Sequence, residues 1–376
     1  MNTSSLRRTA ILLLLFALLA AGVSALQKVD KPSLVSTEGR SFEKAVVVQI
    51  LRDNLQENGA RIGDQIVRLQ LSSGSRQGEY VEANSPNGLL FGTVCQPGMQ
   101  VITIASRSGS QQIYTVYSLD RFWPIAGFIG AFLLLLCLIG GSKGIKSAIA
   151  LLLTFACFLL LFFPLLLHGM APITDAVLVS FLVLCAAIWL IQGTTWSALT
   201  AILASCLGVF TAGTAAMLFG HAAGLSGWNV ANIEALLFIA QSTPIDVGQL
   251  LFAGILFSSL GAVMDIAMDI TAAGAELCRR QPDIPPYELF ESCLHVGRDV
   301  MGTMSATLIL AFFGGSLGLC VLDYVYDLPT LQLMNSNTIG IGLMQGLSGS
   351  FGIILTVPAA ALLCARLPHG GKQRAK

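Results

Sequence analysis

The sequence has few charged residues. Asp, Glu, Lys and Arg make up only 11% of its 376 residues, whereas soluble domains carry about 25%. The chain therefore cannot cover an ordinary water-facing surface, and 54% of it is hydrophobic. Its 21 basic and 21 acidic residues cancel, so nothing in the overall charge indicates nucleic acid as a partner.

Motifs that would assign a reaction or a metal site are also absent. The nine cysteines and four histidines include no CxxC pair and no Cys/His metal spacing, and the chain has no P-loop. Two GxSG segments, 224–227 and 346–349, match the nucleophile motif of intramembrane serine proteases. That mechanism needs a histidine on a later spanning helix, and the only histidine after Ser348 is His369 in the tail. We therefore expect neither an enzyme nor a cofactor, and the residues leave the question of a metal open.

Long apolar runs dominate what is present. Eight of them approach the roughly 20 residues that cross the hydrocarbon core of a bilayer. They cover residues 10–26, 122–140, 148–167, 176–191, 197–218, 247–268, 303–322 and 339–363. We predict an α-helical polytopic membrane protein with seven or eight transmembrane helices and the lipid bilayer as its main partner.

The first run has two interpretations. Arg7 and Arg8 precede a short apolar stretch, and Val23-Ser24-Ala25 resembles a signal cleavage site. Residues 1–26 therefore fit a signal peptide or a first transmembrane anchor equally well. Both interpretations send residues 27–121 across the membrane.

The basic residues predict the topology. Lys143 and Lys146, the segment 279–298 and the tail 367–376 carry the positive charges that flank the helices, and loops 168–175, 221–246 and 323–338 carry no Lys or Arg. Positive loops stay in the cytoplasm. We expect a multi-pass cell membrane protein with a helical membrane domain at 122–366 and a basic cytoplasmic tail at 367–376.

The segment 27–121 has a different pattern. Five short β-branched and partly alternating stretches lie at 44–51, 64–71, 78–82, 99–105 and 111–117, separated by turn residues. They predict a small extracytoplasmic all-β domain, either a barrel or a sandwich. Cys95 is the only cysteine in this segment, so an internal disulfide scaffold is excluded.

Two acidic residues in an apolar run are the main candidates for a functional site. Asp265 and Asp269 are four residues apart, so they share one helix face. A carboxylate inside a membrane is costly and commonly functional. The pair could coordinate a cation or relay protons. A structural ion pair, or solvation near the inner interface, would explain the residues equally simply.

The next helix offers partners for these carboxylates. Arg298 could pair with Asp265 or Asp269, and Asp299 suits a helix start. Thr303 could line a path or bond its own backbone. Before them, Pro286 and the spacing of the apolar residues predict a short amphipathic helix at 286–296, lying on the cytoplasmic surface within the loop 279–298.

Two long motifs carry a family resemblance. The segments LGAVMDIAMDITAAGAEL (260–277) and ELFESCLHVGRDVMGTMSATLILAFFGGS (288–316) resemble the YibE/F-like family of bacterial multi-pass membrane proteins. The resemblance extends from about residue 42 onward. It implies a multi-pass membrane protein but no particular substrate or catalytic residue. Relatives more often have Ser at the position of Asp269, which makes Asp265 the better candidate.

Two functions remain. The first is a permease that moves an ion or small solute through Asp265, Asp269, Arg298, Asp299 and Thr303. The second is a non-transporting scaffold whose outer β-domain binds an envelope partner. The number of apolar runs favours the permease, since one helix would suffice as an anchor. A second membrane or envelope protein and a second copy of the chain are the protein partners that we expect.

Overall fold

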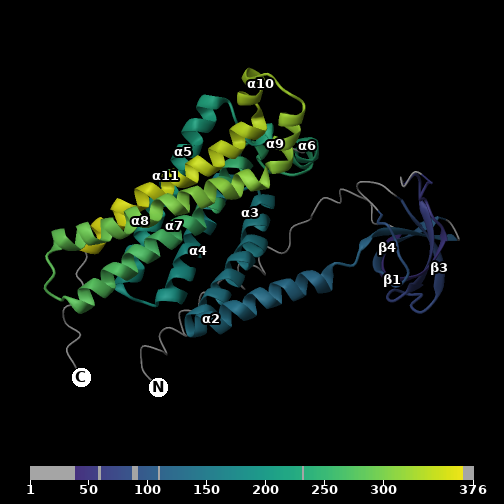
Figure 1. Ribbon diagram of the computed structural model, residues 1–376, viewed down its shortest axis with the longest axis horizontal. Coiled ribbons are helices and arrows are strands. Elements are labelled where there is room, and N and C mark those ends of the chain that lie inside the picture. Colours follow the sequence, from purple (N-terminus) through teal and green to yellow (C-terminus); the bar gives the residue numbers. More distant parts are fainter. Residues whose placement is uncertain (1–38, 58–60, 87–91, 109–110, 231–232, 367–376) are drawn as a thin grey trace. The chain divides into compact units, whose positions relative to one another are not determined.

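The computed structural model describes residues 39–57, 61–86, 92–108, 111–230 and 233–366. These residues belong to two compact units, which meet in the sequence between Leu135 and Leu136. Each unit is described here by itself (Figure 1). The first apolar run, 10–26, and the basic tail, 367–376, lie outside the described residues.

The first unit contains a closed five-stranded barrel, which confirms the barrel prediction. Its strands are β1 (Arg40–Arg52), β2 (Gln65–Leu71), β3 (Tyr80–Ser85), β4 (Gln100–Ser108) and β5 (Gln111–Leu119), in the order β1-β2-β3-β5-β4. Side chains alternate between the two faces of a strand. Val67, Leu69 and Leu71 of β2 therefore all point into the core, together with Val47 and Val101.

Strand β1 is longer than the sequence predicts because it pairs with two neighbours. Residues Arg40–Val46 pair with β4, and residues Ala45–Arg52 pair with β2. Register shifts lie between Val47 and Gln49 and between Ile50 and Arg52. Irregularities of this kind bend a strand, which lets one strand turn the corner of a small barrel.

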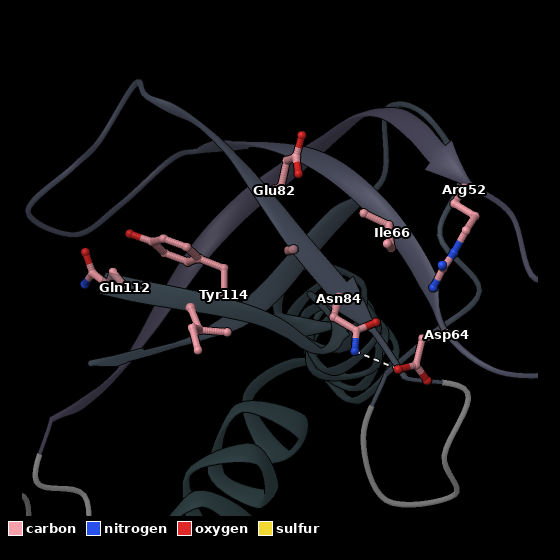
Figure 2. Close-up of a pocket in the computed structure, with 9 residues that line it drawn as sticks. Arg52, Asp64, Ile66, Glu82, Asn84, Gln112 and Tyr114 are labelled. Atoms are coloured by element: carbon pink, nitrogen blue, oxygen red, sulfur yellow. Dashed lines mark hydrogen bonds between the residues drawn. The ribbon is translucent and has the colours of Figure 1, made fainter. Parts of the chain in front are cut away.

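The barrel closes through a short contact between β3 and β5. Only Ala83–Tyr114 and Asn84–Thr115 pair there, in parallel. A cleft of about 390 Å³ lies beside this contact (Figure 2). Its polar lining includes Arg52, Asp64 and Glu82.

The second unit is helical. Its elements are α2 (Phe122–Cys157, which begins in the first unit), the π-helix η1 (Phe158–Phe162), α3 (Phe163–Leu167), α4 (Pro172–Gln192), α5 (Trp196–Ala223), the short 3₁₀ helix η2 (Gly227–Asn229), α6 (Ile233–Ser242), α7 (Val247–Arg280), α8 (Pro286–Gly315), α9 (Leu317–Val325), α10 (Thr330–Met334) and α11 (Asn337–Arg366). Helix α11 packs against α5, α7 and α8, and α7 also packs against α4 and α5.

Six helical segments in the described part of the chain are long and apolar enough to cross a membrane. The predicted runs 122–140 and 148–167 belong to one of them, which covers Phe122–Leu167 and has 46 residues. The backbone leaves the helical region at Gly141, with φ 54° and ψ −133°. At 1.5 Å per residue the parts before and after Gly141 are roughly 29 Å and 39 Å long, so each is about as long as a hydrocarbon core is thick.

Helix α8 differs from the prediction. It begins at Pro286 as expected, but the predicted surface helix 286–296 continues without a break to Gly315. Gly297 lies inside this helix at a close contact, where a Cβ would come within 2.9 Å of Ile270 and 2.4 Å of Val357. The predicted run 303–322 instead divides at Ser316, where α9 follows.

Candidate functional site

Asp265 and Asp269 lie on the surface of the helical unit. Both side chains are exposed on one face of α7. Further along α7, Glu276 pairs with Arg279 at 2.6 Å and with Arg280 at 2.7 Å. Asp265 precedes Glu276 by roughly 16 Å along the helix axis. The two aspartates are therefore separated from the charged end of α7 by about two or three helical turns.

Arg298, Asp299 and Thr303 are exposed on α8. The Thr303 hydroxyl donates to the backbone carbonyl of Val300 at 2.8 Å. Of the two alternatives for Thr303, the structure therefore shows the hydrogen bond to its own helix backbone. Among the described residues, no ion pair joins Arg298 to either aspartate of α7. The five residues that the sequence singles out therefore do not form one closed site within a single chain.

Asp175 is a candidate that the sequence prediction missed. It lies in the first turn of α4, and its side chain is 0% exposed. Within the described ranges, neither of its carboxylate oxygens has a hydrogen-bond partner. Such a group is rare, because burying a charge without compensation is very costly. In the sequence, Asp175 ends a predicted loop. The only sequence signal for a functional carboxylate here is that an acidic residue directly precedes an apolar run.

Helix α4, which contains Asp175, packs against α7 and runs parallel to it. The Ile173 N–H donates to Gln249 Oε1 at 3.5 Å near their starts, and Gln192 Nε2 donates to the Met268 carbonyl at 3.4 Å near the other end. Gln249 Nε2 in turn donates to Asp246 Oδ2 at 2.7 Å. Asp246 is exposed and Gln249 is half-buried. Polar groups thus lie between the surface and the first turn of α4.

Other buried polar atoms occur in the same unit. The hydroxyls of Ser180 on α4, Ser205 on α5 and Ser348 on α11 are buried and lack a partner in the part of the chain that the structure describes. Buried polar groups in proteins normally have a partner. The helical interior therefore offers unused donors and acceptors in three packed helices.

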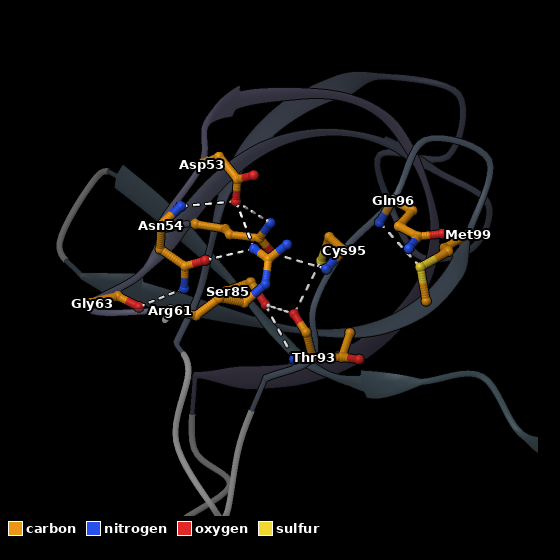
Figure 3. Close-up of polar contacts among 10 residues, drawn as sticks. Asp53, Asn54, Arg61, Gly63, Ser85, Thr93, Cys95, Gln96 and Met99 are labelled. Atoms are coloured by element: carbon orange, nitrogen blue, oxygen red, sulfur yellow. Dashed lines mark hydrogen bonds and ion pairs between the residues drawn. The ribbon is translucent and has the colours of Figure 1, made fainter. Parts of the chain in front are cut away.

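The barrel has a polar network of a different kind (Figure 3). Gln65 is buried; its Nε2 donates to Asp53 Oδ1 at 2.9 Å, and its Oε1 accepts from the Cys95 N–H at 2.8 Å. The hydrogen bonds from Gln65 and Arg61 lower the pKa of Asp53, and burial raises the pKa of the Cys95 thiol. A buried thiol with a raised pKa is unreactive, so this network is structural.

No metal centre is evident in the described part of either unit. Among the described residues, no group of three or more His, Cys, Asp or Glu side chains is arranged to hold a metal ion. In the barrel cleft, Asn84 Nδ2 donates to Asp64 Oδ2 at 2.7 Å (Figure 2). The cleft therefore presents one basic and two acidic side chains, Arg52, Asp64 and Glu82, together with the Asn84–Asp64 hydrogen bond.

The comparison with protein families gives one match. The family described as YibE/F-like protein matches residues 128–369. This stretch is more than half of the 376 residues and includes the motifs at 260–277 and 288–316. It does not include the barrel, so the match is narrower than the resemblance that begins near residue 42. No curated protein and no solved structure matches the chain.

Proposed function

The chain belongs to the YibE/F-like family, and from this premise we propose that it is a membrane permease that moves a proton or a small cation. The observation that carries the proposal is Asp175, whose two carboxylate oxygens are buried and have no partner among the described residues. A carboxyl group in such a place binds a proton or a cation, because the bare charge is too costly there.

The proposed route begins at the ends of α4 and α7. Exposed Asp246 attracts the cation, and half-buried Gln249 guides it toward Asp175. Asp265 and Asp269 form a second acidic station further along α7. Buried carboxylates inside spanning helices mark proton and ion pathways in many transporters, and protonation of Asp175 would remove its charge between two transfers.

The orientation is part of the proposal. The basic segments 143–146 and 279–298 lie in the cytoplasm, and the barrel lies outside a bacterial cell membrane. The starts of α4 and α7 then face the exterior. Asp175 becomes the outer station, and Asp265 and Asp269 lie nearer the cytoplasm. The proposal includes no catalysed reaction and no cofactor.

A scaffold is the second candidate, and the barrel cleft favours it. A cleft of about 390 Å³ lined by Arg52, Asp64, Glu82 and Asn84 could hold part of an envelope partner. The helical unit would then serve as an anchor. A scaffold gives no reason for the unpartnered Asp175 carboxyl, whereas a permease does.

Purified protein in liposomes tests the proposal. Vesicles that contain a pH-sensitive dye or a cation-sensitive dye should report a flux that Asp175→Asn abolishes, since the amide keeps the shape but cannot ionise. Asp283→Asn, on the exposed connection between α7 and α8, is the control and should leave the flux unchanged. Absence of flux with every ion offered, or normal flux in a folded Asp175→Asn variant, would refute the permease.

A further inference from the structure

One face of α7 has no neighbour within the described residues. We call this face the acidic stripe and define it by Gly254, Gly261, Asp265, Asp269 and Ala272, all of which are exposed. A Cβ added at Gly254 or Gly261 would meet nothing within 4 Å. The opposite face of α7 contains Val263, Ile266 and Ile270, which are fully buried.

Lipid is a poor cover for the acidic stripe. On insertion scales an aspartate in a spanning helix costs up to about 2.5–3.5 kcal/mol, the value at the helix centre. Glycine and alanine offer little surface to lipid, but they let a second helix approach closely. A face that combines small residues with two carboxylates therefore suits contact with another polar helix.

Arg298 has a charge opposite to that of the two aspartates and lies at the same depth as Asp269. A Cβ on the preceding residue, Gly297, would lie 2.9 Å from Ile270, which follows Asp269 in α7. Arg298 and Asp269 are thus at the same level of the bundle. Both are exposed, and within the described ranges Arg298 makes no ion pair. Copies of one chain insert in a membrane with the same orientation, so these two charges also lie at the same depth in different copies.

We propose that two copies of the chain associate through the acidic stripe, with Arg298 of one copy pairing with Asp269 of the other and Asp265 beside the pair. The pair neutralises charges that a single copy leaves exposed on its surface. Bidentate contact between a guanidinium and a carboxylate also fixes the register of the two copies. The association does not require transport, although Asp265 and Asp269 belong to both proposals.

Cross-linking between two differently tagged copies tests the interface. One copy carries Asp269→Cys and the other carries Arg298→Cys, and both are expressed in the same membrane. A short thiol-reactive cross-linker should join the two tags in one species of twice the chain mass. The control expresses each variant together with a copy that has neither substitution. It tests whether the nine native cysteines react, and it should give no species of twice the chain mass.

A charge exchange provides a second measurement. Arg298→Glu should reduce the co-purification of two tags by at least about tenfold, which corresponds to 1.4 kcal/mol. Arg298→Glu combined with Asp269→Arg in every copy should restore it. Recovery in the double variant also excludes misfolding as the cause of the loss in Arg298→Glu, because a second substitution would not refold an unfolded chain.

Three results would overturn the proposal. The tags could fail to co-purify from native lipid, or co-purification could be unaffected by Arg298→Glu. Alternatively, a chain with both Asp269→Cys and Arg298→Cys could form only the cross-link within itself, and then another segment of the same chain covers the acidic stripe.

Discussion

Gly208 on α5 and Gly352 on α11 bring two helix backbones into contact. A Cβ on Gly352 would lie 2.7 Å from the carbonyl oxygen of Gly208, and a Cβ on Gly208 would lie 3.1 Å from the carbonyl oxygen of Gly352. Real Cβ contacts are essentially never shorter than 3.0 Å. Because the atoms on both sides belong to the backbone, a side chain can be accommodated only if the helices separate.

The first prediction follows from this contact. Gly352→Ala should destabilise the helical unit by about 1–3 kcal/mol, the usual cost of overpacking. Thermal unfolding of the detergent-solubilised protein measures the change. Gly130→Ala on α2 is the matched control, because a Cβ there meets nothing within 4 Å. Equal melting temperatures for the two variants would contradict the contact.

The glycine patterns show what a local pattern can and cannot predict. The sequence contains small residues four apart at Gly342 and Gly346, continued by Gly349 and Gly352, and again at Gly314 and Gly318. Gly346 packs against Ile309 and Gly349 against Leu308, whereas a Cβ at Gly314 or Gly318 meets nothing within 4 Å. The pattern identifies helices that can approach closely, but the arrangement of helices decides whether a neighbour is present.

The same distinction applies to the fold. Alternation and hydropathy are local properties, and they predict the barrel strands and most spanning runs. The continuity of α8 was not predicted, because hydropathy separates the more polar residues 286–296 from the apolar run that begins at 303, although one helix contains both. Asp175 was missed because its burial depends on how α4 packs against its neighbouring helices.

The second prediction concerns the break in α2. Gly141 adopts φ 54° and ψ −133°, a region that side chains rarely tolerate. Gly141→Ala should therefore cost about 1–3 kcal/mol of stability through backbone strain. Gly140→Ala is the control, because its backbone is helical and a Cβ there meets nothing within 4 Å. Thermal unfolding in detergent should separate the two variants, and a Gly141→Ala protein as stable as the control would disprove the strain.

The third prediction tests the buried amide of the barrel. Gln65→Leu leaves the N–H of Cys95 buried without its acceptor, because Gln65 Oε1 accepts that hydrogen bond at 2.8 Å. The barrel should lose about 1–3 kcal/mol, the cost of an unsatisfied buried group. Protease cleavage within residues 39–119 of the full chain measures this loss.

Gln49→Leu is the control for that experiment. Gln49 is exposed on β1, so its substitution leaves no buried group unpaired. Its cleavage rate should stay close to that of the unmodified chain. If the two variants were cleaved at the same rate, the Gln65 network would not stabilise the barrel.

The last prediction is a pH dependence that originates in Asp53. Hydrogen bonds from Gln65 and Arg61 hold the pKa of its carboxyl below the ordinary 3.8 in the folded barrel. A lowered folded-state pKa adds stability above the unfolded-state pKa, and this stability is lost as the pH falls through the folded value. Amide exchange of β1 and β2 in the full chain should therefore be faster in Asp53→Asn than in the unmodified chain at about pH 7, and the difference should shrink toward about pH 2. Comparison at each pH removes the intrinsic pH dependence of exchange. A difference that stayed constant across this range would mean that the charge of Asp53 contributes nothing to the stability of the barrel.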